Sequence, residues 1–371
     1  MRILYYSRDY TTHDHRFLTT LAKTEHRVYY LRLENSGQAF EDRPLPPGIE
    51  IVEWAGGTQP ARLKDGLHLL EDLRRVIRKV KPELIHAGPI QRSAFLVALC
   101  GFHPLVSTSW GYDLLHDAHL NPFWGWATRY TLKHSDAFVG DCDTIRNLAI
   151  SYGMKRHHIV TFPWGIDLDH FNVKEFTHND GSKNDEPPHT QMFSLLSTRS
   201  FEPIYGIDVI ARAFVIAARI RPELQLTMLG GGSQWAPIRQ ILLVGGVFEQ
   251  VQFPGLVAFS ELPAYHQAAD VYVSASHSDG TSISLLEAFA SGTPAITSNI
   301  PGNQEWITPG ENGWLFPDGN PEAMAAAILH AMDQRQNLPE MGRNARILAE
   351  SRADWEKNFP QLEKAYALAM H

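Results

Sequence analysis

Two acidic residues, Asp279 and Glu287, lie eight positions apart around the start of a predicted helix. An apolar run, Val271–Val273, precedes them and ends as a strand would. Apolar residues then recur with helical spacing at Ile283, Leu286, Phe289 and Ala290. The N-terminus of a helix binds anions through its unpaired N–H groups and its dipole. The loop and first turn, comprising Gly280, Thr281, Ser282 and Ile283, are therefore predicted to bind an anion, with one carboxylate on each side.

A purely structural interpretation of the same stretch is also open. The run Ser284–Glu287 has the spacing of a capping box, in which the glutamate side chain reaches back to the serine N–H. In that case Asp279 is a loop residue.

Length and composition limit the class of protein. The chain has 371 residues, which suits two domains. A net charge of −8 and a pI of about 6.1 argue against a nucleic-acid partner. The two cysteines, Cys100 and Cys142, lack metal-ligand spacing and indicate a reducing compartment. The N-terminus lacks the apolar core of a signal peptide, and no stretch approaches about 18 apolar residues, so we expect no membrane span.

The elements that must position these residues follow a β-α-β order. The run 2–7 is predicted to form a buried strand, 16–22 an amphipathic helix and 28–31 the next strand, which favours a parallel sheet. A long helix is predicted at 355–370. Loops that follow strands in such sheets line ligand crevices, and Asp113 lies in a loop of this kind.

The stretch from Asp279 to Pro294 resembles the E-x7-E signature of the retaining GT-B glycosyltransferases of family GT4, with aspartate in place of the first glutamate. The resemblance extends over nearly the whole chain and is denser in 193–316. It implies an α/β protein of the GT-B fold, with two Rossmann-like domains whose parallel sheets face a cleft. The implied parts are an acceptor domain, a linker, a donor domain and a returning C-terminal helix, at 1–172, 173–191, 192–353 and 354–371.

The resemblance also implies roles for the donor domain. Asp279 contacts the donor sugar, Glu287 holds the ribose, and Arg199 neutralises the diphosphate together with the helix N-terminus. Tyr205 stands where the family has a second phosphate-binding residue, a lysine, and one extra residue precedes Gly206. The glycine run that begins with Gly230 and the loop that contains Leu256 are expected to lie beside the nucleotide and its base. The catalytic residues implied are Asp279 and Arg199.

The acceptor domain departs more from the family. Thr11–His15 replaces the usual glycine-rich turn, and it is predicted either to contact the acceptor or to be a solvated loop in which Asp14 caps a helix. Trp110 replaces a histidine and either stacks on a sugar or packs in the fold. Asp113 matches the family and is expected in the acceptor pocket.

The implied activity is a metal-independent, retaining hexosyl transfer from a nucleotide-diphosphate sugar of the UDP or GDP type to a glycan, lipid or small molecule. No cofactor is expected besides that donor, and a cytoplasmic location is predicted, with peripheral contact at the inner face of a membrane left open. The oligomeric state also stays open. Two alternatives remain: another reaction on a sugar nucleotide, such as epimerisation or phosphorolysis, and a non-catalytic protein that binds sugar nucleotides.

Overall fold

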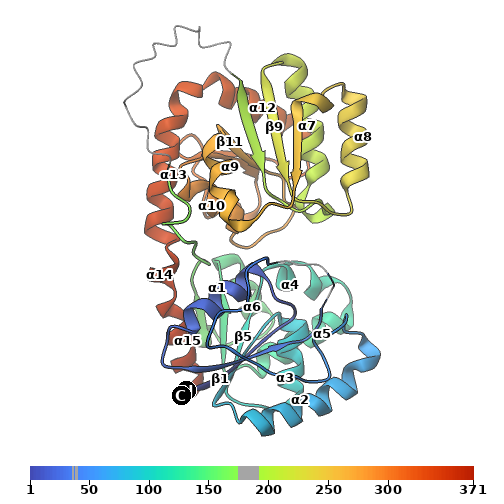
Figure 1. Cartoon of the computed structure of the whole chain (residues 1–371), viewed down its shortest axis with the longest axis vertical. Coiled ribbons are helices and arrows are strands. Elements are labelled where there is room, and N and C mark those ends of the chain that lie inside the picture. The colour runs from blue at the N-terminus through green and yellow to red at the C-terminus, as the bar shows by residue number, and fades with distance from the viewer. Residues whose placement is uncertain (36, 38–40, 174–191) are drawn as a thin grey trace. The chain divides into compact units, whose positions relative to one another are not determined.

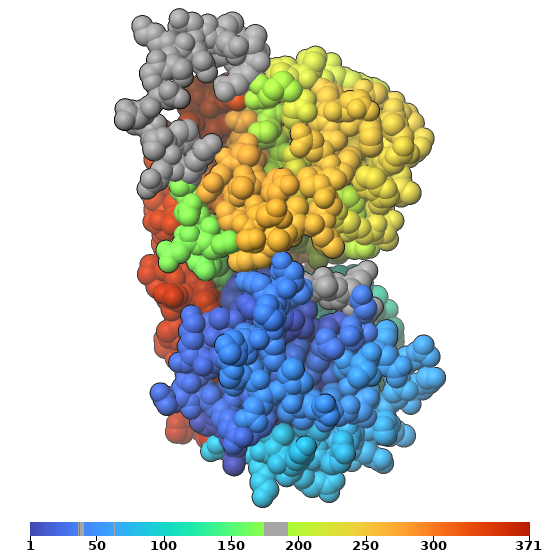
Figure 2. All heavy atoms as spheres, in the orientation of Figure 1, coloured from blue at the N-terminus to red at the C-terminus, as the bar shows by residue number. Residues whose placement is uncertain are grey.

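The computed structural model describes residues 1–35, 37, 41–173 and 192–371. The chain divides into two compact units, the first formed by Met1–Pro163 with Lys357–His371 and the second by Trp164–Glu356 (Figure 1). On the face shown in Figure 2, the blue N-terminal part forms much of the surface of the first unit, and yellow and orange parts form that of the second.

The domain limits predicted from the sequence differ from these units. The stretch from Trp164 to 172 belongs to the second unit, where Ile166 and Phe171 pack in a core with residues of the later helices. The returning segment begins at Lys357 and not at 354. Apart from Val173, the predicted linker lies outside the described residues.

A seven-stranded parallel sheet forms the centre of the first unit, in the order β3-β2-β1-β4-β5-β6-β7. Strand β1 is buried at five of its six positions, as its apolar run predicts for a central strand covered on both faces. The strands are β1 Arg2–Ser7, β2 Arg27–Arg32, β3 Glu50–Ile51, β4 Leu84–Ala87, β5 Leu105–Thr108, β6 Ala137–Gly140 and β7 Ile159–Thr161.

Helices connect these strands, as parallel pairing requires. They are α1 Thr12–Leu21, α2 Gly66–Val80, α3 Phe95–Cys100, α4 Tyr112–Leu115, α5 Pro122–Lys133 and α6 Asp143–Ser151, with a π-helical turn, η2, at Ile90–Ala94 and single 3-10 turns at Leu63–Asp65, Asp117–His119 and Arg156–His158. Helix α1 begins earlier than the predicted 16–22 because Thr11 caps it and Asp14 completes a capping box.

The second unit holds a six-stranded sheet, also parallel, in the order β10-β9-β8-β11-β12-β13. Its strands are β8 Phe193–Ser197, β9 Leu224–Leu229, β10 Val251–Gly255, β11 Val271–Ser274, β12 Ala295–Ser298 and β13 Gly313–Phe316. Two parallel α/β units of this kind confirm the predicted GT-B class of fold.

The helices of the second unit are α7 Ile207–Ile220, α8 Trp235–Gly245, α9 Leu262–Ala268, α10 Ile283–Ala290, α11 Pro301–Gln304, α12 Pro321–Asp333 and α13 Leu338–Arg352, with 3-10 turns at Pro203–Tyr205, Phe248–Gln250, Phe259–Glu261 and Arg335–Asn337. Two C-terminal helices follow, α14 Trp355–Asn358 and α15 Pro360–Met370. No helix within the described ranges is long and apolar enough to cross a bilayer.

The predicted last helix, 355–370, is broken between α14 and α15. Pro360 is the first residue of α15, where its missing N–H costs nothing, but inside one continuous helix it would disrupt the preceding turn. Helix α15 packs on β5, β6 and β7 of the first unit. There the buried Tyr366 hydroxyl lies 2.8 Å from Nδ1 of His86 on β4, which identifies this histidine as a core residue.

Candidate functional site

The predicted donor residues of the second unit all follow strands of one sheet. Arg199 comes after β8, Gly230 after β9, Leu256 after β10 and Asp279 after β11. Because these strands are parallel, their carboxyl ends meet at one edge. The strand order reverses at β8, which has β9 on one side and β11 on the other, and ligands of open α/β sheets bind at such a switch point.

Arg199 and Asp279 form an ion pair at this point. Nη2 of Arg199 lies 2.7 Å from Oδ2 of Asp279, and Nη1 donates to the hydroxyls of Ser282 (3.2 Å) and Ser284 (3.1 Å). The guanidinium also lies 4.1 Å from the ring centroid of Tyr205. Four contacts thus fix one cation beside the start of α10.

The charge state of Arg199 follows from this environment. Burial alone would lower the pKa of its guanidinium, but the Asp279 carboxylate and the nearby tyrosines outweigh burial and raise that pKa. The side chains of Arg199 and Asp279 are only 12% and 21% exposed. Arg199 therefore stays positively charged at every physiological pH, and its contact with Asp279 is partly buried and charge-assisted.

The capping box predicted as an alternative for Ser284 and Glu287 is wrong. The N-cap of α10 is Ser282, whose side chain makes no capping hydrogen bond. Ser284 lies inside the first turn, where its hydroxyl accepts from Arg199 and from Tyr272 Oη (2.8 Å). The first N–H groups of α10 have no intrahelical partner, which leaves an anion-binding end beside the guanidinium of Arg199.

Glu287 lies one turn further into α10 and is buried. Its Oε2 is 3.9 Å from Nε2 of His266, a fully buried histidine on α9. Burial lowers the pKa of His266 to about 3, so this imidazole is neutral near pH 7 and the contact is not an ion pair. His266 therefore does not act as a cationic partner of Glu287.

A glycine at the start of α11 holds the loop of Asp279 in place. A Cβ atom on Gly302 would come 2.2 Å from the carbonyl oxygen of Gly280 and 2.7 Å from that of Asp279. Real Cβ atoms do not approach backbone that closely, so the loop packs directly against α11 only because residue 302 is glycine.

Gly230 and Leu256 lie where two neighbouring loops meet. The N–H of Gly230 donates to the carbonyl of Gly255 at 2.7 Å, and Gly230 has a φ of +100°, which a side chain would disfavour. Leu256 is 84% exposed. An exposed leucine side chain and a glycine backbone thus lie at the edge of the second sheet where Arg199 lies. Contact of Gly230 and Leu256 with a nucleotide stays a prediction.

In the first unit, the structure gives Asp14 the capping role that the sequence left as one of two options. Oδ2 accepts from the N–H (2.9 Å) and hydroxyl (2.6 Å) of Thr11, and Oδ1 accepts from Tyr5 Oη (3.1 Å). Burial raises the pKa of Asp14 to about 6. Asp14 is 1% exposed, so its oxygens serve the fold.

Asp113 is used in a similar way. Its carboxylate accepts from the N–H groups of Ile90 (2.9 Å), Trp110 (3.1 Å) and Leu114 (3.1 Å) and from the Ser109 hydroxyl (2.5 Å). Burial raises its pKa to about 6. Trp110 stacks on His13, with ring centroids 5.0 Å apart, so it packs within the fold. Acceptor contact by these residues stays a prediction.

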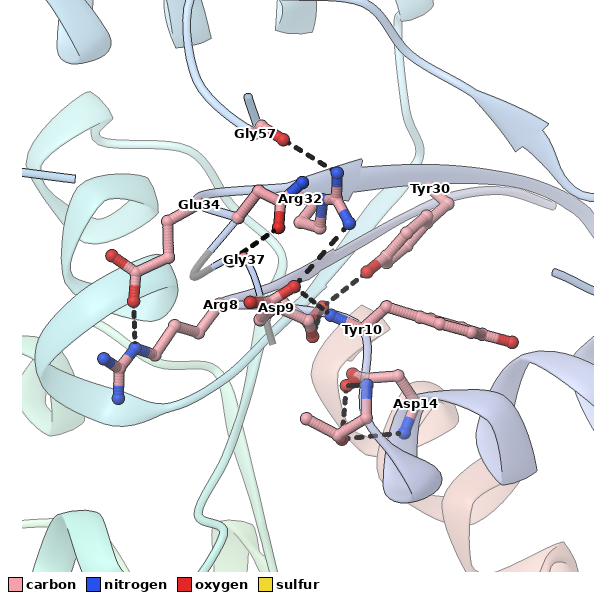
Figure 3. Close-up of polar contacts among 12 residues, drawn as sticks. Arg8, Asp9, Tyr10, Asp14, Tyr30, Arg32, Glu34, Gly37 and Gly57 are labelled. Carbon is pink, nitrogen blue, oxygen red and sulfur yellow. Dashed lines mark hydrogen bonds and ion pairs between the residues drawn. The ribbon is translucent and has the colours of Figure 1, made fainter. Parts of the chain in front are cut away.

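A cavity of about 600 Å³ that the sequence did not suggest lies in the same unit. Its walls are mainly aromatic and aliphatic, with the rings of Tyr10, Tyr30 and Trp54 among them. The phenol of Tyr30, labelled in Figure 3, lies 3.0 Å from the Ser7 hydroxyl. Trp54 Nε1 donates to the Arg32 carbonyl. Their polar atoms are thus hydrogen-bonded within the protein, and mainly the faces of their rings line the cavity.

Two sequence families match the chain. The family described as Glycosyl transferases group 1 matches residues 180–348, and Glycosyltransferase Family 4 matches residues 11–170. The two matches are consecutive and fall mainly in the second and the first unit, respectively.

Individual relatives agree with these families. The GtfA subunit of a UDP-N-acetylglucosamine–peptide N-acetylglucosaminyltransferase from Streptococcus pneumoniae is 30% identical over 170 residues, which are 46% of this chain and 31% of that protein. A D-inositol 3-phosphate glycosyltransferase from Paenarthrobacter aurescens is 29% identical over 60% of this chain and 55% of its own length. The chain thus spans about a third to a half of these two relatives.

The fold matches a solved enzyme over its full length. A sucrose-phosphate synthase from Thermosynechococcus elongatus superposes with a TM-score of 0.80, covering 99% of this chain and 98% of that one. The two sequences are 19% identical, so this likeness concerns the fold alone.

Proposed function

The chain belongs to the group 1 glycosyltransferases with the GT-B fold, and from this premise we propose that it transfers a sugar from a nucleotide-diphosphate sugar to an acceptor, with retention of the anomeric configuration. The single observation that carries the proposal is the grouping of Arg199, Asp279 and the start of α10 at the switch point of the second sheet. UDP is the first nucleotide to test, because one relative is named for UDP-N-acetylglucosamine.

In this proposal the leaving group is the nucleoside diphosphate. The bond between the anomeric carbon and the phosphate oxygen breaks, and negative charge grows on the diphosphate. Arg199 and the first N–H groups of α10 stabilise that charge, without a metal ion, and they are held in position before the reaction. A diphosphate would take over the donor edge of Arg199 that Asp279 now occupies, since guanidinium forks bind phosphate oxygens well.

Released from that ion pair, Asp279 would bear its charge beside the sugar, where positive charge develops at the anomeric carbon. Glu287 would accept hydrogen bonds from the ribose hydroxyls. The acceptor hydroxyl forms the new bond from the face that the diphosphate leaves, and its proton departs with the diphosphate, which yields retention.

The proposal is tested by product analysis. The protein is incubated with UDP-, GDP- and ADP-sugars and candidate acceptors, and the anomeric configuration of donor and product is compared by NMR coupling constants. We expect a glycoside of unchanged configuration with one of the nucleotides, in buffer containing a chelator as well as without it. An epimerised donor, or a sugar phosphate formed from inorganic phosphate, would replace the proposal with another reaction.

A matched pair of variants tests the role of Glu287. Glu287→Gln keeps the shape of the side chain but removes its charge, and we expect the donor KM to rise about 10- to 100-fold, because hydrogen bonds to charged groups contribute about 1.5–3 kcal/mol. Glu340→Gln, on the exposed face of α13, is the control and should leave the donor KM unchanged. An unaltered KM in Glu287→Gln would remove this residue from the donor site.

A further inference from the structure

Two arginines of the first unit lie just beyond the ends of two neighbouring strands. Arg8 follows β1 directly, and Arg92 lies in η2, which follows β4. Strands β1 and β4 pair in parallel, with Tyr6 opposite Ala87, so the segments that leave them run side by side. Burial and the charge of Arg8 lower the pKa of Arg92. The carboxylates of Glu34 and Asp117 act in the opposite direction and raise it.

Among the described residues, Arg8 is held by one edge of its guanidinium. Its Nε donates to Oε1 of Glu34, a buried glutamate whose other oxygen accepts from the N–H of Ala61 at 2.9 Å. Figure 3 shows the Arg8 side chain extending to Glu34 and away from the separate pair of Arg32 and Asp9. The Arg8 side chain is 49% exposed. Its two terminal nitrogens thus lie beyond the contact that fixes it.

Arg92 is held by its face. Its guanidinium carbon lies 5.0 Å from the ring centroid of Trp124 on α5. Within the part of the chain that the structure describes, Arg92 has no ion pair, and its buried Nε has no hydrogen-bond partner. An arginine stacked on a ring keeps all its N–H groups in its plane for another ligand. Leaving a buried donor of a charged group without an acceptor is costly, so this arrangement favours a bound partner.

Other arginines of the same unit are neutralised. Arg32 lies 3.6 Å from Asp9, and Arg43 binds Glu41 through two nitrogens, each at 2.7 Å. By contrast, Arg8 makes one ion pair, with Glu34, and Arg92 makes none among the described residues, although Glu34 and Asp117 lie near enough to act on its charge. The mutual repulsion of Arg8 and Arg92 would be relieved by an anion that accepts from both guanidinium groups.

We propose that Arg8 and Arg92 form an anion-binding subsite of the first unit, and that the acceptor carries a phosphate or carboxylate group which they bind. The second clause rests on the proposed glycosyl transfer; the first does not. A phosphate monoester suits the pair best, because its oxygens can accept from two guanidinium groups at once. The group can belong to a soluble sugar acid or phosphate, or to a lipid headgroup.

The test uses the full chain saturated with UDP, so that the nucleotide site cannot contribute to phosphate binding. Inorganic phosphate is titrated at constant ionic strength, and binding is followed by the rise in melting temperature that a ligand of the folded state produces. We expect saturable binding to the unaltered protein and at least a tenfold weaker affinity in Arg92→Gln and in Arg8→Gln. Equal affinity in Arg92→Gln and the unaltered protein would overturn the subsite.

Arg129→Gln is the matched control. Arg129 stacks on Tyr152 at 5.3 Å in the same unit but is exposed and is not part of the pair, so its loss should not change phosphate affinity. A purely structural role for Arg92 predicts a lower melting temperature in Arg92→Gln with the same phosphate-dependent rise, which would also overturn the proposal.

Two further arms identify the source of the anion and separate the two proposals. Binding to vesicles containing phosphatidic acid, a phosphate monoester, that is lost in Arg92→Gln supports a lipid headgroup, whereas phosphate binding without vesicle binding supports a soluble acceptor. If UDP, GDP and ADP all fail to bind while phosphate binding still depends on Arg92, the glycosyltransferase proposal fails and the subsite stands. If UDP binds and Arg92 has no effect on either probe, the subsite fails alone.

Discussion

The two units use the acidic residues at their strand ends differently. In the second unit, Asp279 is paired with the guanidinium of Arg199. In the first unit, Asp14 and Asp113 accept hydrogen bonds from backbone N–H groups and hydroxyls around them, including the N–H of Ile90 in η2. A carboxylate that balances a cation can be displaced by a ligand phosphate, whereas one that holds loop amides cannot leave without disrupting its loop. The same residue type is therefore paired with a cation in one unit and bonded to backbone and hydroxyl donors in the other.

The largest expected effect on activity comes from removing the cation that pairs with Asp279. Arg199→Met should lower kcat/KM about 100- to 1,000-fold, as removal of one strong donor to a developing negative charge does, while the protein stays folded. Arg212→Met is the control, because Arg212 forms an exposed pair with Asp208 on the same unit. Steady-state kinetics with the donor identified by product analysis measures the effect, and a loss below threefold would contradict it.

In the first unit, the corresponding variant, Asp113→Ala, is expected to lower stability. It leaves four hydrogen-bond donors without their acceptor, so the melting temperature should fall by several degrees, since each lost buried hydrogen bond costs about 1 kcal/mol. A variant that keeps its melting temperature but loses activity would make Asp113 a ligand-binding residue.

A smaller effect is expected from Gly302→Ala. The added methyl group would collide with the carbonyls of Gly280 and Asp279 and displace the loop that carries this aspartate. A shift of about 1 Å at a reacting group can cost about 100-fold in rate. The control is Gly66→Ala in the first unit, where a Cβ meets nothing within 4 Å. Unchanged kinetics in Gly302→Ala would show that the loop position is unimportant.

Lowering the pH should affect the two units unequally. Burial lowers the pKa of His86 and of His266 to about 3, so each stabilises its unit fully above pH 6.5 and less as the pH falls below that value. Asp14 and Asp113, whose pKa values are raised to about 6, have the opposite pH dependence. They stabilise the first unit fully below pH 3.8, and this stabilisation is lost as the pH rises through 6. The lowered pKa of the half-buried His15 adds to the effect of His86.

Between pH 7 and pH 5, the contributions of these histidines and aspartates to the stability of the first unit largely cancel. The second unit should lose about 2 kcal/mol of its free energy of unfolding through His266. Hydrogen exchange of strand amides at both pH values, corrected for intrinsic rates, measures this unit by unit. His266→Phe should remove the pH dependence of the second unit, and an equal loss in both units would argue against the assignment.

The smallest effect concerns Leu256. Leu256→Ser should raise the donor KM a few-fold, since burial of an exposed leucine against a base contributes on the order of 1 kcal/mol, and it should leave stability unchanged. Leu67→Ser, at an 80% exposed leucine of the first unit, is the matched control. If both variants behave alike, Leu256 does not contact the donor.

Much of this arrangement could be predicted from local sequence. Buried apolar runs predicted parallel strands, and the spacing of Asp279 and Glu287 placed them around one helix start. The ion pair between Arg199 and Asp279 could not be predicted, because 80 positions separate the two residues and only the sheet order brings them together.

The cap of α10 was ambiguous for a different reason. Thr281, Ser282 and Ser284 can all cap a helix, so the sequence alone does not select Ser282. The role of Asp14 depended on burial beside Tyr5 of β1, which no local pattern reveals. Arg92 was not singled out either, because its signal is a missing partner, and that is visible only after every neighbouring carboxylate has been located.

The return of α15 to the first unit affects how this protein can be divided. A fragment ending at Pro163 would lack the helix that places Tyr366 against His86, and it would expose the β5–β7 face that α15 covers. Grafting a foreign nucleotide-binding half onto this chain therefore requires two splice points, near 163 and 357, so that the native C-terminal residues are retained. Chimeras with a single splice point should aggregate on expression, whatever the quality of the transplanted half.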